Sequence, residues 1–286
     1  MSKSSLLGVI GGSGLYSMKD LEVLEEVPVD TPFGAPSDVL VRGRLQGRDI
    51  VFLPRHGVGH RIPPSEINYR ANIYAMKKIG VSRILSVSAV GSMKEEIAPG
   101  HIVLPDQFID RTYRRINTFF TTGLVGHVGL ASPVCSDLGR QVAAAARKAG
   151  AHLHEGGTYI CIEGPQFSTR AESLLYRSWG VEVIGMTNVT EARLAREAGL
   201  CYVTIALATD YDCWHEGEEA VTVEAVLEIM HQNVTLAQAI VRETAQMPLE
   251  PAGCDCARAA DFAVVTDPSR IPDDLKNDLK ILFPKL

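Results

Sequence analysis

The segment "LCYVTIALATDYD", residues 200–212, joins a continuous apolar run to two carboxylates that follow it directly. The run from Leu200 to Ala208 has the character of a strand buried on both faces, which is typical of α/β proteins. Asp210 and Asp212 then stand at the end of a buried strand, where α/β proteins bind small molecules. Two acids in this position are also compatible with a helix cap or a solvated turn, and the rest of the chain has to decide between these interpretations.

Strand-like and helix-like patterns alternate on both sides of this segment. Strands are predicted over the apolar runs at residues 6–10, 39–45, 49–53, 83–90, 101–105, 158–162, 181–186 and 201–208. A capping box of Thr169 and Glu172 predicts one helix start, and further helices are predicted at residues 65–79, 137–149, 191–198 and 224–245. This order predicts an α/β fold in which a single domain, residues 1–286, has a central mixed β-sheet flanked by helices. Residues 247–286 are expected to form a loop-rich tail with one short helix.

The composition narrows the classes of function. The chain has 286 residues, of which 46% are hydrophobic, so it can bury a full core. A net charge of -6 from 28 basic and 34 acidic residues, with no long basic cluster, predicts no nucleic-acid partner. No run reaches the roughly 20 apolar residues of a membrane helix, and the start "MSKSSLLGVIGG" lacks the apolar core of a signal peptide. We therefore expect a cytoplasmic protein without a membrane partner.

Six cysteines occur in the chain, at positions 135, 161, 201, 213, 254 and 256. Only Cys254 and Cys256 are close in sequence. A structural zinc site needs four ligands, usually in pairs two to four residues apart, whereas "CDC" has one intervening residue and no second pair after it. We therefore expect no metal site. The other thiols are expected to be buried and reduced, while a redox or disulfide role for Cys254 and Cys256 stays open.

The glycine-rich stretch "GVIGGSGLY", residues 8–16, follows a predicted strand directly. A dinucleotide-binding turn would need a third glycine where this chain has Ser17, so the spacing disfavours a nicotinamide-dependent oxidoreductase. The backbone N–H groups of such a turn can still bind an anion. A plain tight turn explains the same glycines, and the residues alone leave both interpretations open.

Polar side chains stand at the ends of four predicted strands. Ser13 lies in the glycine-rich turn, and Arg55 and His56 follow the strand at residues 49–53. A guanidinium can hold phosphate through two parallel hydrogen bonds, and an imidazole can donate beside it. Ser88 and Thr187 supply hydroxyl groups at two further strand ends. Each of these residues is compatible with packing at a turn, but together they predict a phosphate site at one edge of the sheet.

A series of longer motifs resembles a known family. They are, in order, "GVIGGSGLY", "DTPFGAPSD", "PRHG", "NYRANIYAMKKIG", "VSAVGS", "DQFIDRT", "IEGPQFSTRAE", "GMTN" and "ATDYDCW". Together they cover residues 7–245 and resemble the 5'-methylthioadenosine phosphorylases of the trimeric purine nucleoside phosphorylase family. Ser13 and Ser88 stand where threonine is often found, so the hydroxyl groups are kept, and Thr190 replaces a common proline. The tail resembles the family less.

The resemblance implies phosphorolysis of 5'-methylthioadenosine, in which inorganic phosphate attacks C1' of the nucleoside and adenine departs. Phosphate is then a co-substrate, and no cofactor is expected. The glycosidic bond breaks through an oxocarbenium-like transition state, and the purine leaves more easily when N7 is protonated. A carboxyl group beside a second carboxyl group tends to keep a proton, which suits Asp210 as the donor to N7. Asp212, together with Asp210, would accept from the 6-amino group of adenine.

The resemblance also assigns contacts with the nucleoside. Phe167 would stack on the base, and Met186 and Ala89 would contact the ribose. Relatives that use 6-oxopurines carry a glutamate at the position of Ser168 and an asparagine near Asp210. Neither is present here, which favours a 6-aminopurine. A purine nucleoside phosphorylase of broader specificity and a 5'-methylthioinosine phosphorylase are the alternatives.

Three further residues lie outside the strand ends. Val223 and Val226 would form an apolar slot for the 5'-methylthio group, although ordinary core packing explains the same spacing. His127 corresponds to a residue that reaches the 5'-substituent from a neighbouring subunit. The family expectation is therefore a homotrimer, with a hexamer as the alternative. A nucleotide-binding module without catalysis is the remaining class, and it would bind adenosine analogues without releasing adenine.

Overall fold

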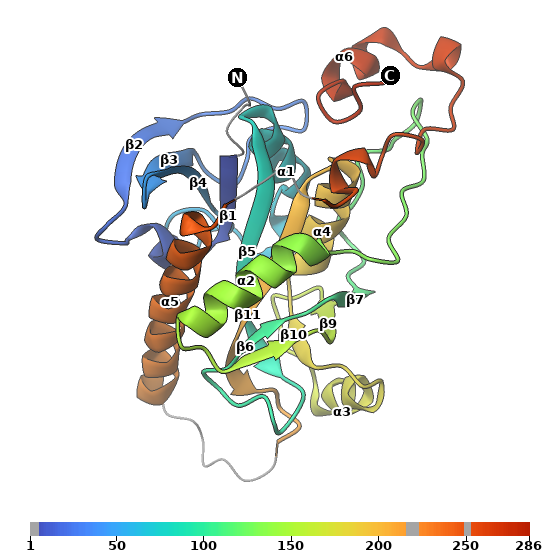
Figure 1. Cartoon of the computed structure of the whole chain (residues 1–286). Helices are drawn as coiled ribbons and strands as arrows, with labels where there is room; N and C mark the ends of the chain where they lie inside the picture. The colour runs from blue at the N-terminus through green and yellow to red at the C-terminus, as the bar shows by residue number, and fades with distance from the viewer. Residues whose placement is uncertain (1–5, 216–222, 249–252) are drawn as a thin grey trace.

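The computed structural model describes residues 6–215, 223–248 and 253–286, and for Ser13, Tyr16 and residues 223–228 it describes the backbone alone (Figure 1). The strands are β1 (Leu6–Gly11), β2 (Glu22–Val27), β3 (Leu40–Leu45), β4 (Arg48–Pro54), β5 (Val81–Ser92), β6 (Ile102–Leu104), β7 (Gln107–Arg111), β8 (Leu153–Glu155), β9 (Thr158–Ile162), β10 (Val183–Gly185) and β11 (Cys201–Tyr211). The α-helices are α1 (Tyr69–Lys78), α2 (Ser136–Lys148), α3 (Arg170–Ser178), α4 (Asn188–Glu197), α5 (Val223–Gln246) and α6 (Asp273–Leu279).

One 11-stranded mixed sheet runs through the molecule. Its main path is β2-β3-β4-β1-β5-β10-β9-β7, while β11 pairs with β5 and β6, and β6 pairs with β8. Strands β4, β1, β5 and β11 are parallel neighbours, whereas β10 runs antiparallel to β5. The predicted fold, a mixed sheet flanked by helices, is confirmed.

Strand β5 changes partners along its length. Its first half pairs with β1 as far as Ser86, which lies opposite Ile10, and its last residues pair with β10, which starts opposite Ser92. Strand β11 follows β5 along the other side almost throughout. In the pairing that the structure records, residues 87–90 therefore lie between the end of β1 and the end of β10. This is the place in the sheet where other groups can reach β5 from that side.

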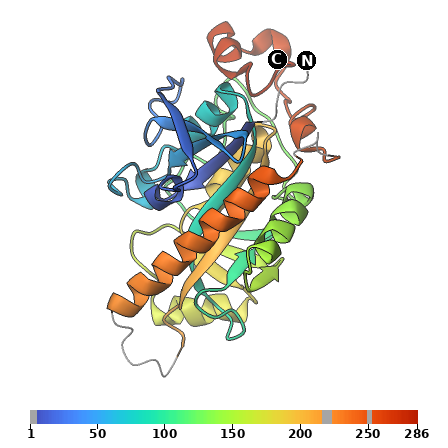
Figure 2. The ribbon, with the colours of Figure 1, turned by 60° about the vertical axis from the view of Figure 1, so that its left-hand side comes forward.

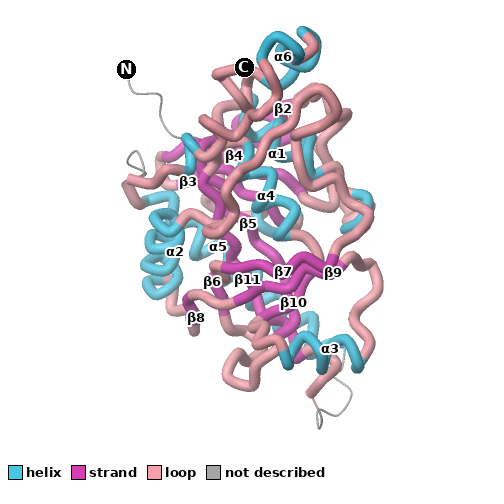
Figure 3. The backbone as a smooth tube through the Cα atoms, turned by 90° about the vertical axis from the view of Figure 1, so that its right-hand side faces the viewer, coloured by secondary structure: helices cyan, strands magenta, loops and turns pink. Residues whose placement is uncertain are grey.

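Helices cover both faces of the central strands. On one face, α2 and α5 pack on alternate residues such as Leu85 of β5 and Val203 of β11 (Figure 2). On the other face, α1 and α4 pack on the intervening residues, such as Ile84 and Tyr202 (Figure 3). Side chains of a strand alternate between the faces, so a strand covered on both must be apolar at nearly every position. This explains the continuous apolar run in β11.

Local signals set most helix starts. The capping box of Thr169 and Glu172 is present at the start of α3, as predicted. Helix α1 begins at Tyr69, four residues later than predicted, because Ile67 is extended and the side chain of Asn68 caps the helix by accepting from the N–H of Ala71. The two prolines before it open only a short 3-10 turn.

Three differences from the predicted strands bear on the site. Strand β11 continues to Tyr211, so Asp210 lies on the strand and not after it. The register of β11 against β5 shifts between Ala208 and Asp210, which marks a β-bulge. Strands β2, β7 and β8 were not predicted. Strand β2 is mostly exposed, and β8 has only three residues, so neither carries an apolar pattern.

The tail after α5 packs on the domain, with Ile271, Leu279, Leu282 and Phe283 buried in the same cluster as residues of α1 and α4. It carries one short α-helix, α6, and two 3-10 turns, which agrees with the prediction of a loop-rich segment. None of the helices in the described part of the chain combines the length and the apolar character that a bilayer crossing requires. The cytoplasmic location stays a prediction.

Candidate active site

The candidate site lies where β1, β4, β5, β10 and β11 come together. The backbone N–H of Arg55, directly after β4, donates to the carbonyl of Gly11 at the end of β1, at 2.9 Å. Ala89 of β5 is exposed, whereas its neighbours Ser88 and Val90 are buried. An exposed residue in the middle of a buried strand indicates an opening in the sheet, at the position where β5 changes partners.

Arg55 has a side chain that is 3% exposed and bonded mainly to protein groups. Its Nε and Nη2 donate to the two carboxylate oxygens of Glu191, at 2.5 and 3.2 Å. Its Nη2 also donates to Ser86 Oγ at 2.6 Å, and its Nη1 donates to the carbonyl of Val87 at 2.9 Å. The Nε–Nη2 edge expected to hold phosphate is engaged by Glu191 in this structure, and the predicted contact of Arg55 with phosphate stays a prediction. Among bonds with described residues, one Nη1 proton is left for a ligand beside Val87.

Glu191 was not predicted as a site residue. It is 1% exposed on α4 and accepts from Arg55, from Ser86 Oγ at 2.6 Å and from the hydroxyl of Tyr202 at 2.9 Å. Asn188 Nδ2 donates to Ser86 Oγ at 2.9 Å and to the Tyr202 hydroxyl at 3.0 Å. We call these five residues the Arg55 network. A buried acid on the sheet-facing side of a helix was the only signal in the sequence, and its partner lies 136 residues away.

The charges inside the Arg55 network stabilise each other. Burial alone would lower the pKa of Arg55, but the charge and hydrogen bonds of Glu191 raise it above its usual value. Replacing one member of such a pair leaves an unpaired buried charge, which typically costs about 3–5 kcal/mol. The network therefore fixes the guanidinium in one position before any ligand binds.

His56 has a defined tautomer. Its Nδ1 lies 2.8 Å from the carbonyl of Ile62, and since a carbonyl only accepts, Nδ1 carries a proton. Burial, reinforced by the charge of Arg55, lowers the pKa of His56 to about 4. The neutral ring then presents Nε2 as an acceptor. The expected donation to phosphate requires a second proton on the ring, which a bound dianion would favour.

Ser88 and Thr187 are both buried close to the opening. Ser88 Oγ donates to the carbonyl of Ala89 at 3.2 Å, and Thr187 Oγ1 donates to Asn188 Oδ1 at 3.2 Å. These bonds are long and local, so both hydroxyl groups can turn toward a ligand. Their predicted contact with phosphate stays a prediction, as does that of Ser13, whose side chain lies outside the described residues.

Tyr159 of β9 carries a further buried hydroxyl at this point, and it was not predicted as a site residue. Ser88 and Thr187 lie close enough to affect its pKa, which burial raises above its usual value. Within the described part of the chain, the Tyr159 hydroxyl has no hydrogen-bond partner of suitable geometry. A Cβ at Gly185 would come within 1.9 Å of this oxygen, so only glycine fits there.

The two acids lie close to one glycine in β5. A Cβ at Gly91 would be 3.2 Å from Asp210 Oδ1 and 3.4 Å from Asp212 Cβ. Asp210 is half-buried and accepts from the hydroxyl of Thr209 at 2.6 Å. Asp212 is buried, and its Oδ2 accepts from Ser173 of α3 at 2.5 Å. The acids are thus neighbours two residues from exposed Ala89, and the expectation that Asp210 holds a proton stays a prediction.

The loop before α3 borders the acids. The carbonyl of Ser168 accepts from Cys213 Sγ at 3.4 Å, and Cys213 follows Asp212 directly. Ser168 Oγ is buried and has no partner among the described residues. Phe167 is 84% exposed, so its ring is available for stacking. The contact with Cys213 places Ser168 beside Asp212, and the predicted roles of Phe167 and Ser168 stay predictions.

Arg115 holds this region together and was also not predicted. Its Nε donates to Glu163 Oε1 at 3.0 Å, and its Nη1 donates to the carbonyl of Met186 at 2.5 Å. A Cβ at Gly164 would be 2.5 Å from the sulfur of Met186, so the loop packs closely on that side chain. Met186 therefore packs against the loop before α3 and directly precedes Thr187, and its contact with the ribose stays a prediction.

For three predicted residues the structure describes no contact with this place. His127 is exposed in the segment between β7 and α2, and its N–H donates to the carbonyl of Ala263 in the tail at 2.8 Å. No described contact joins His127 to the strand ends, so a role would have to be in another copy's site. Val223 and Val226 lie on the first turn of α5, and their side chains are outside the described residues.

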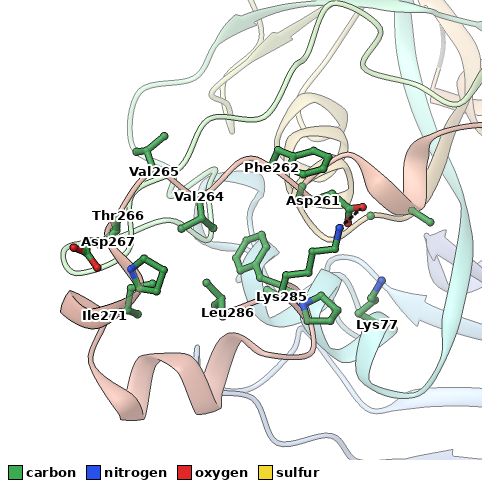
Figure 4. A pocket seen from close by; sticks show the side chains of 17 residues that line it. Lys77, Asp261, Phe262, Val264, Val265, Thr266, Asp267, Ile271, Lys285 and Leu286 are labelled. Carbon is green, nitrogen blue, oxygen red and sulfur yellow. Dashed lines mark ion pairs between the residues drawn. The ribbon is translucent and has the colours of Figure 1, made fainter.

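A pocket of about 550 Å³ lies elsewhere, between the tail and the end of α1 (Figure 4). Lys77, Phe262, Val264 and Lys285 are among its lining residues. None of the predicted site residues lines it. Among the described residues, the pocket has neither acids on a strand nor hydroxyl groups at strand ends. We therefore place the candidate active site at the strand ends and not in this pocket.

Known proteins resemble the chain over nearly its full length. An S-methyl-5'-thioadenosine phosphorylase of Geobacter sulfurreducens is 59% identical over 279 residues, covering 97% of this chain and 98% of the relative. A solved methylthioadenosine phosphorylase from an antarctic soil metagenomic library has a TM-score of 0.94 at 44% identity, covering 99% of this chain and 100% of that chain. A methylthioadenosine phosphorylase from Schistosoma mansoni, in complex with adenine, has a TM-score of 0.80 at 40% identity, covering 84% and 91%.

The family model also covers the site. It is that of the Phosphorylase superfamily, and it matches residues 6–246, which include both acids, Arg55, Ser88 and Thr187. The resemblance drawn from the sequence motifs is thereby confirmed. On these grounds, the chain belongs to the Phosphorylase superfamily.

Proposed function

We propose that the chain catalyses phosphorolysis of 5'-methylthioadenosine, which yields adenine and 5-methylthioribose-1-phosphate. The observation that carries the proposal is the placement of the acids and the hydroxyl groups along one stretch of β5. Asp210 and Asp212 lie beside Gly91, while Ser88 and Thr187 lie on the other side of exposed Ala89. A nucleoside over Ala89 would have its base near the acids and phosphate near the hydroxyl groups. The names of the relatives support the choice of substrate.

Phosphate would bind at the hydroxyl end of the opening. Arg55 contributes a fixed positive charge and one Nη1 proton, because Glu191, Ser86 and the carbonyl of Val87 hold the rest of the guanidinium. Ser88, Thr187 and the turn at Ser13 would add donors, and His56 would donate from Nε2 once protonated. Donors that are already oriented cost little to reorganise during the reaction. Phosphate held below the ribose would stabilise the cationic sugar and then attack C1'.

The acids would serve the leaving base at the other end. Asp210 is the more accessible of the two, so it suits proton donation to N7 of adenine. Asp212 has one oxygen bound to Ser173, which fixes its orientation. Its other oxygen would accept from the 6-amino group. Acceptors at this place favour a 6-aminopurine over a 6-oxopurine, since an unpaired buried polar group costs about 1–3 kcal/mol.

The assembly we propose is a homotrimer, with a hexamer as the alternative. Exposed His127 supports it, because the residue lies away from the strand ends of its own chain and so could only serve a neighbouring site. Sedimentation of the purified chain separates these states, and a monomer that is fully active would contradict the shared site.

The decisive measurement is adenine release from 5'-methylthioadenosine with and without phosphate. We expect release to depend on phosphate and to yield 5-methylthioribose-1-phosphate in equal amount. Sulfate at the same ionic strength is the control, because it resembles phosphate in shape but cannot complete the reaction. Equal turnover in phosphate-free buffer would mean hydrolysis, and binding without release would mean a nucleoside-binding module. Adenosine and 5'-methylthioinosine as substrates test the broader alternatives.

A further inference from the structure

Four cysteines that are far apart in sequence meet at one point. Cys135, Cys201, Cys254 and Cys256 place their Sγ atoms within 4.8 Å of one another. We call them the cysteine cluster. Cys135 is the N-cap of α2, Cys201 is the first residue of β11, and the other two belong to the tail. All four are free thiols in this structure.

The expectation of no metal site rested on the absence of a second ligand pair next to Cys254 and Cys256. The fold supplies that pair from Cys135 and Cys201, which no spacing in the sequence could show. Four sulfur ligands are the donor set of structural zinc sites. We propose that the cysteine cluster binds one zinc ion through its four thiolates.

The dimensions of the cluster suit a single ion. A tetrahedral zinc–sulfur distance of about 2.3 Å places the sulfurs about 3.8 Å apart. The Cys201 and Cys254 sulfurs are 3.5 Å apart, and every pair lies within 4.8 Å. An iron–sulfur cluster distributes its cysteines over several irons, which demands a wider arrangement. Two disulfides need only two separate pairs, so the convergence of all four sulfurs is better explained by one shared ion.

The surroundings also suit a negatively charged metal–thiolate group. Four thiolates and one Zn²⁺ carry a net charge of about −2. The N–H of Leu138 in the first turn of α2 donates to Cys135 Sγ at 3.5 Å, and Arg196 Nη1 donates to Cys256 Sγ at 3.6 Å. Such outer bonds orient thiolate ligands and offset their charge. Three of the four cysteines are buried, and Cys254 is partly exposed, which leaves a route for the ion to enter.

Bound zinc would fasten the tail to the domain. Cys254 and Cys256 open the described part of the tail, and Cys135 and Cys201 belong to the helix and strand beneath it. The site lies outside the acids and the phosphate donors, so this role is structural. It does not depend on the proposed reaction.

The test is metal binding by the full-length chain, purified in the presence of a reductant. We expect about one zinc per chain after exposure to zinc chloride and removal of excess ion on a desalting column. Cobalt(II) chloride should give the intense visible and near-ultraviolet bands of a tetrahedral tetrathiolate site. Removal of the ion with a chelator should lower the melting temperature, and added zinc should restore it.

Matched variants separate the cluster from the other thiols. The double variant Cys254→Ser/Cys256→Ser should lose zinc and the cobalt bands, whereas Cys213→Ser, which changes an exposed thiol outside the cluster, should keep both. Because the double variant changes only the tail, circular dichroism can verify that the domain is folded. Less than one tenth of a zinc per reduced chain at saturating zinc would overturn the proposal. So would equal binding by the double variant, or two disulfides and no ion in the untreated protein.

Discussion

The two ends of the opening on β5 differ in how their charged groups are satisfied. At one end, Arg55 and Glu191 are 3% and 1% exposed and bind each other and the hydroxyl groups of Ser86 and Tyr202. At the other end, Asp210 is half-buried and Phe167 is 84% exposed. At the Arg55 end, which we call the assembled end, the protein's own residues satisfy the charged groups. At the end that carries Asp210 and Phe167, the side chains are accessible to a substrate. Changes at the first should act on stability, and changes at the second should act on the reaction.

The strongest test of this comparison is Glu191→Gln. The amide keeps the size of the carboxylate but leaves Arg55 as an unpaired buried cation, so we expect a loss of about 3–5 kcal/mol in the free energy of unfolding, measured in urea. The control is Asp20→Asn, which breaks the surface ion pair with Arg242 and should cost about 0–1 kcal/mol. Equal, small losses in both variants would mean that the Arg55 network does not hold the fold.

The second test is Asp210→Asn at the accessible end. Removal of a positioned proton donor typically costs about 100-fold to 10,000-fold in rate, so turnover of 5'-methylthioadenosine should fall by at least about 100-fold. The new amide can donate to O6, so the relative rate on 5'-methylthioinosine should rise. Melting curves should change little. A parallel loss on both substrates together with a lower melting temperature would show that the acid only supports the fold.

The third test uses pH at the assembled end. The pKa of His56 is lowered to about 4 in the folded chain, whereas an unfolded histidine titrates near 6.5. Between these values the unfolded chain binds a proton that the folded chain does not, so stability should fall as pH is lowered from about 6.5 to 4. The full slope for one proton is about 1.4 kcal/mol per pH unit, and partial exposure of the ring should reduce it.

His56→Asn isolates this contribution, because asparagine does not titrate and its amide can still donate to the carbonyl of Ile62. Urea unfolding at several pH values should give a flatter pH dependence for the variant than for the parent chain. Identical slopes would show that His56 has the same pKa in both states. Burial at the Arg55 end would then not lower the pKa of His56.

The smallest expected changes in stability come from replacing two buried tyrosines, and the two replacements should differ. Tyr202→Phe removes a donor to Glu191 and should cost about 1–3 kcal/mol of stability. Tyr159→Phe removes a hydroxyl that has no partner among the described residues, so the melting temperature should stay the same or rise slightly. Thermal melts of both variants make the comparison. A larger loss for Tyr159→Phe would mean that its hydroxyl is satisfied in solution.

Much of the fold could be predicted because covered strands must be apolar and helix caps are local. The strands β1, β5 and β11 and the capping box at α3 follow from these rules. Strand β2 could not be predicted, because its sequence "EVLEEV" is mostly exposed and has no buried face. Its position is set by pairing with β3, which is a tertiary contact.

The site shows the same limit. Strand ends indicated Ser88, Thr187, Asp210 and Asp212, because polar residues that end apolar runs stand out in a sequence. The partner of Arg55 did not stand out, because Glu191 sits on a helix 136 residues further along. The contact of the Arg55 guanidinium with this acid was therefore missed. The meeting of four cysteines was missed for the same reason.

The change of partners along β5 also makes activity a measure of correct folding. Because successive side chains of a strand face opposite sides, a slip of one residue in β5 would turn Ser88 and Ala89 to the wrong faces together. The same slip would move Gly91 away from both acids. Both ends of the opening would fail at once, so a misregistered chain would have no partial activity. In a refolded preparation, the fraction of recovered turnover should therefore count the chains whose central sheet has the correct register.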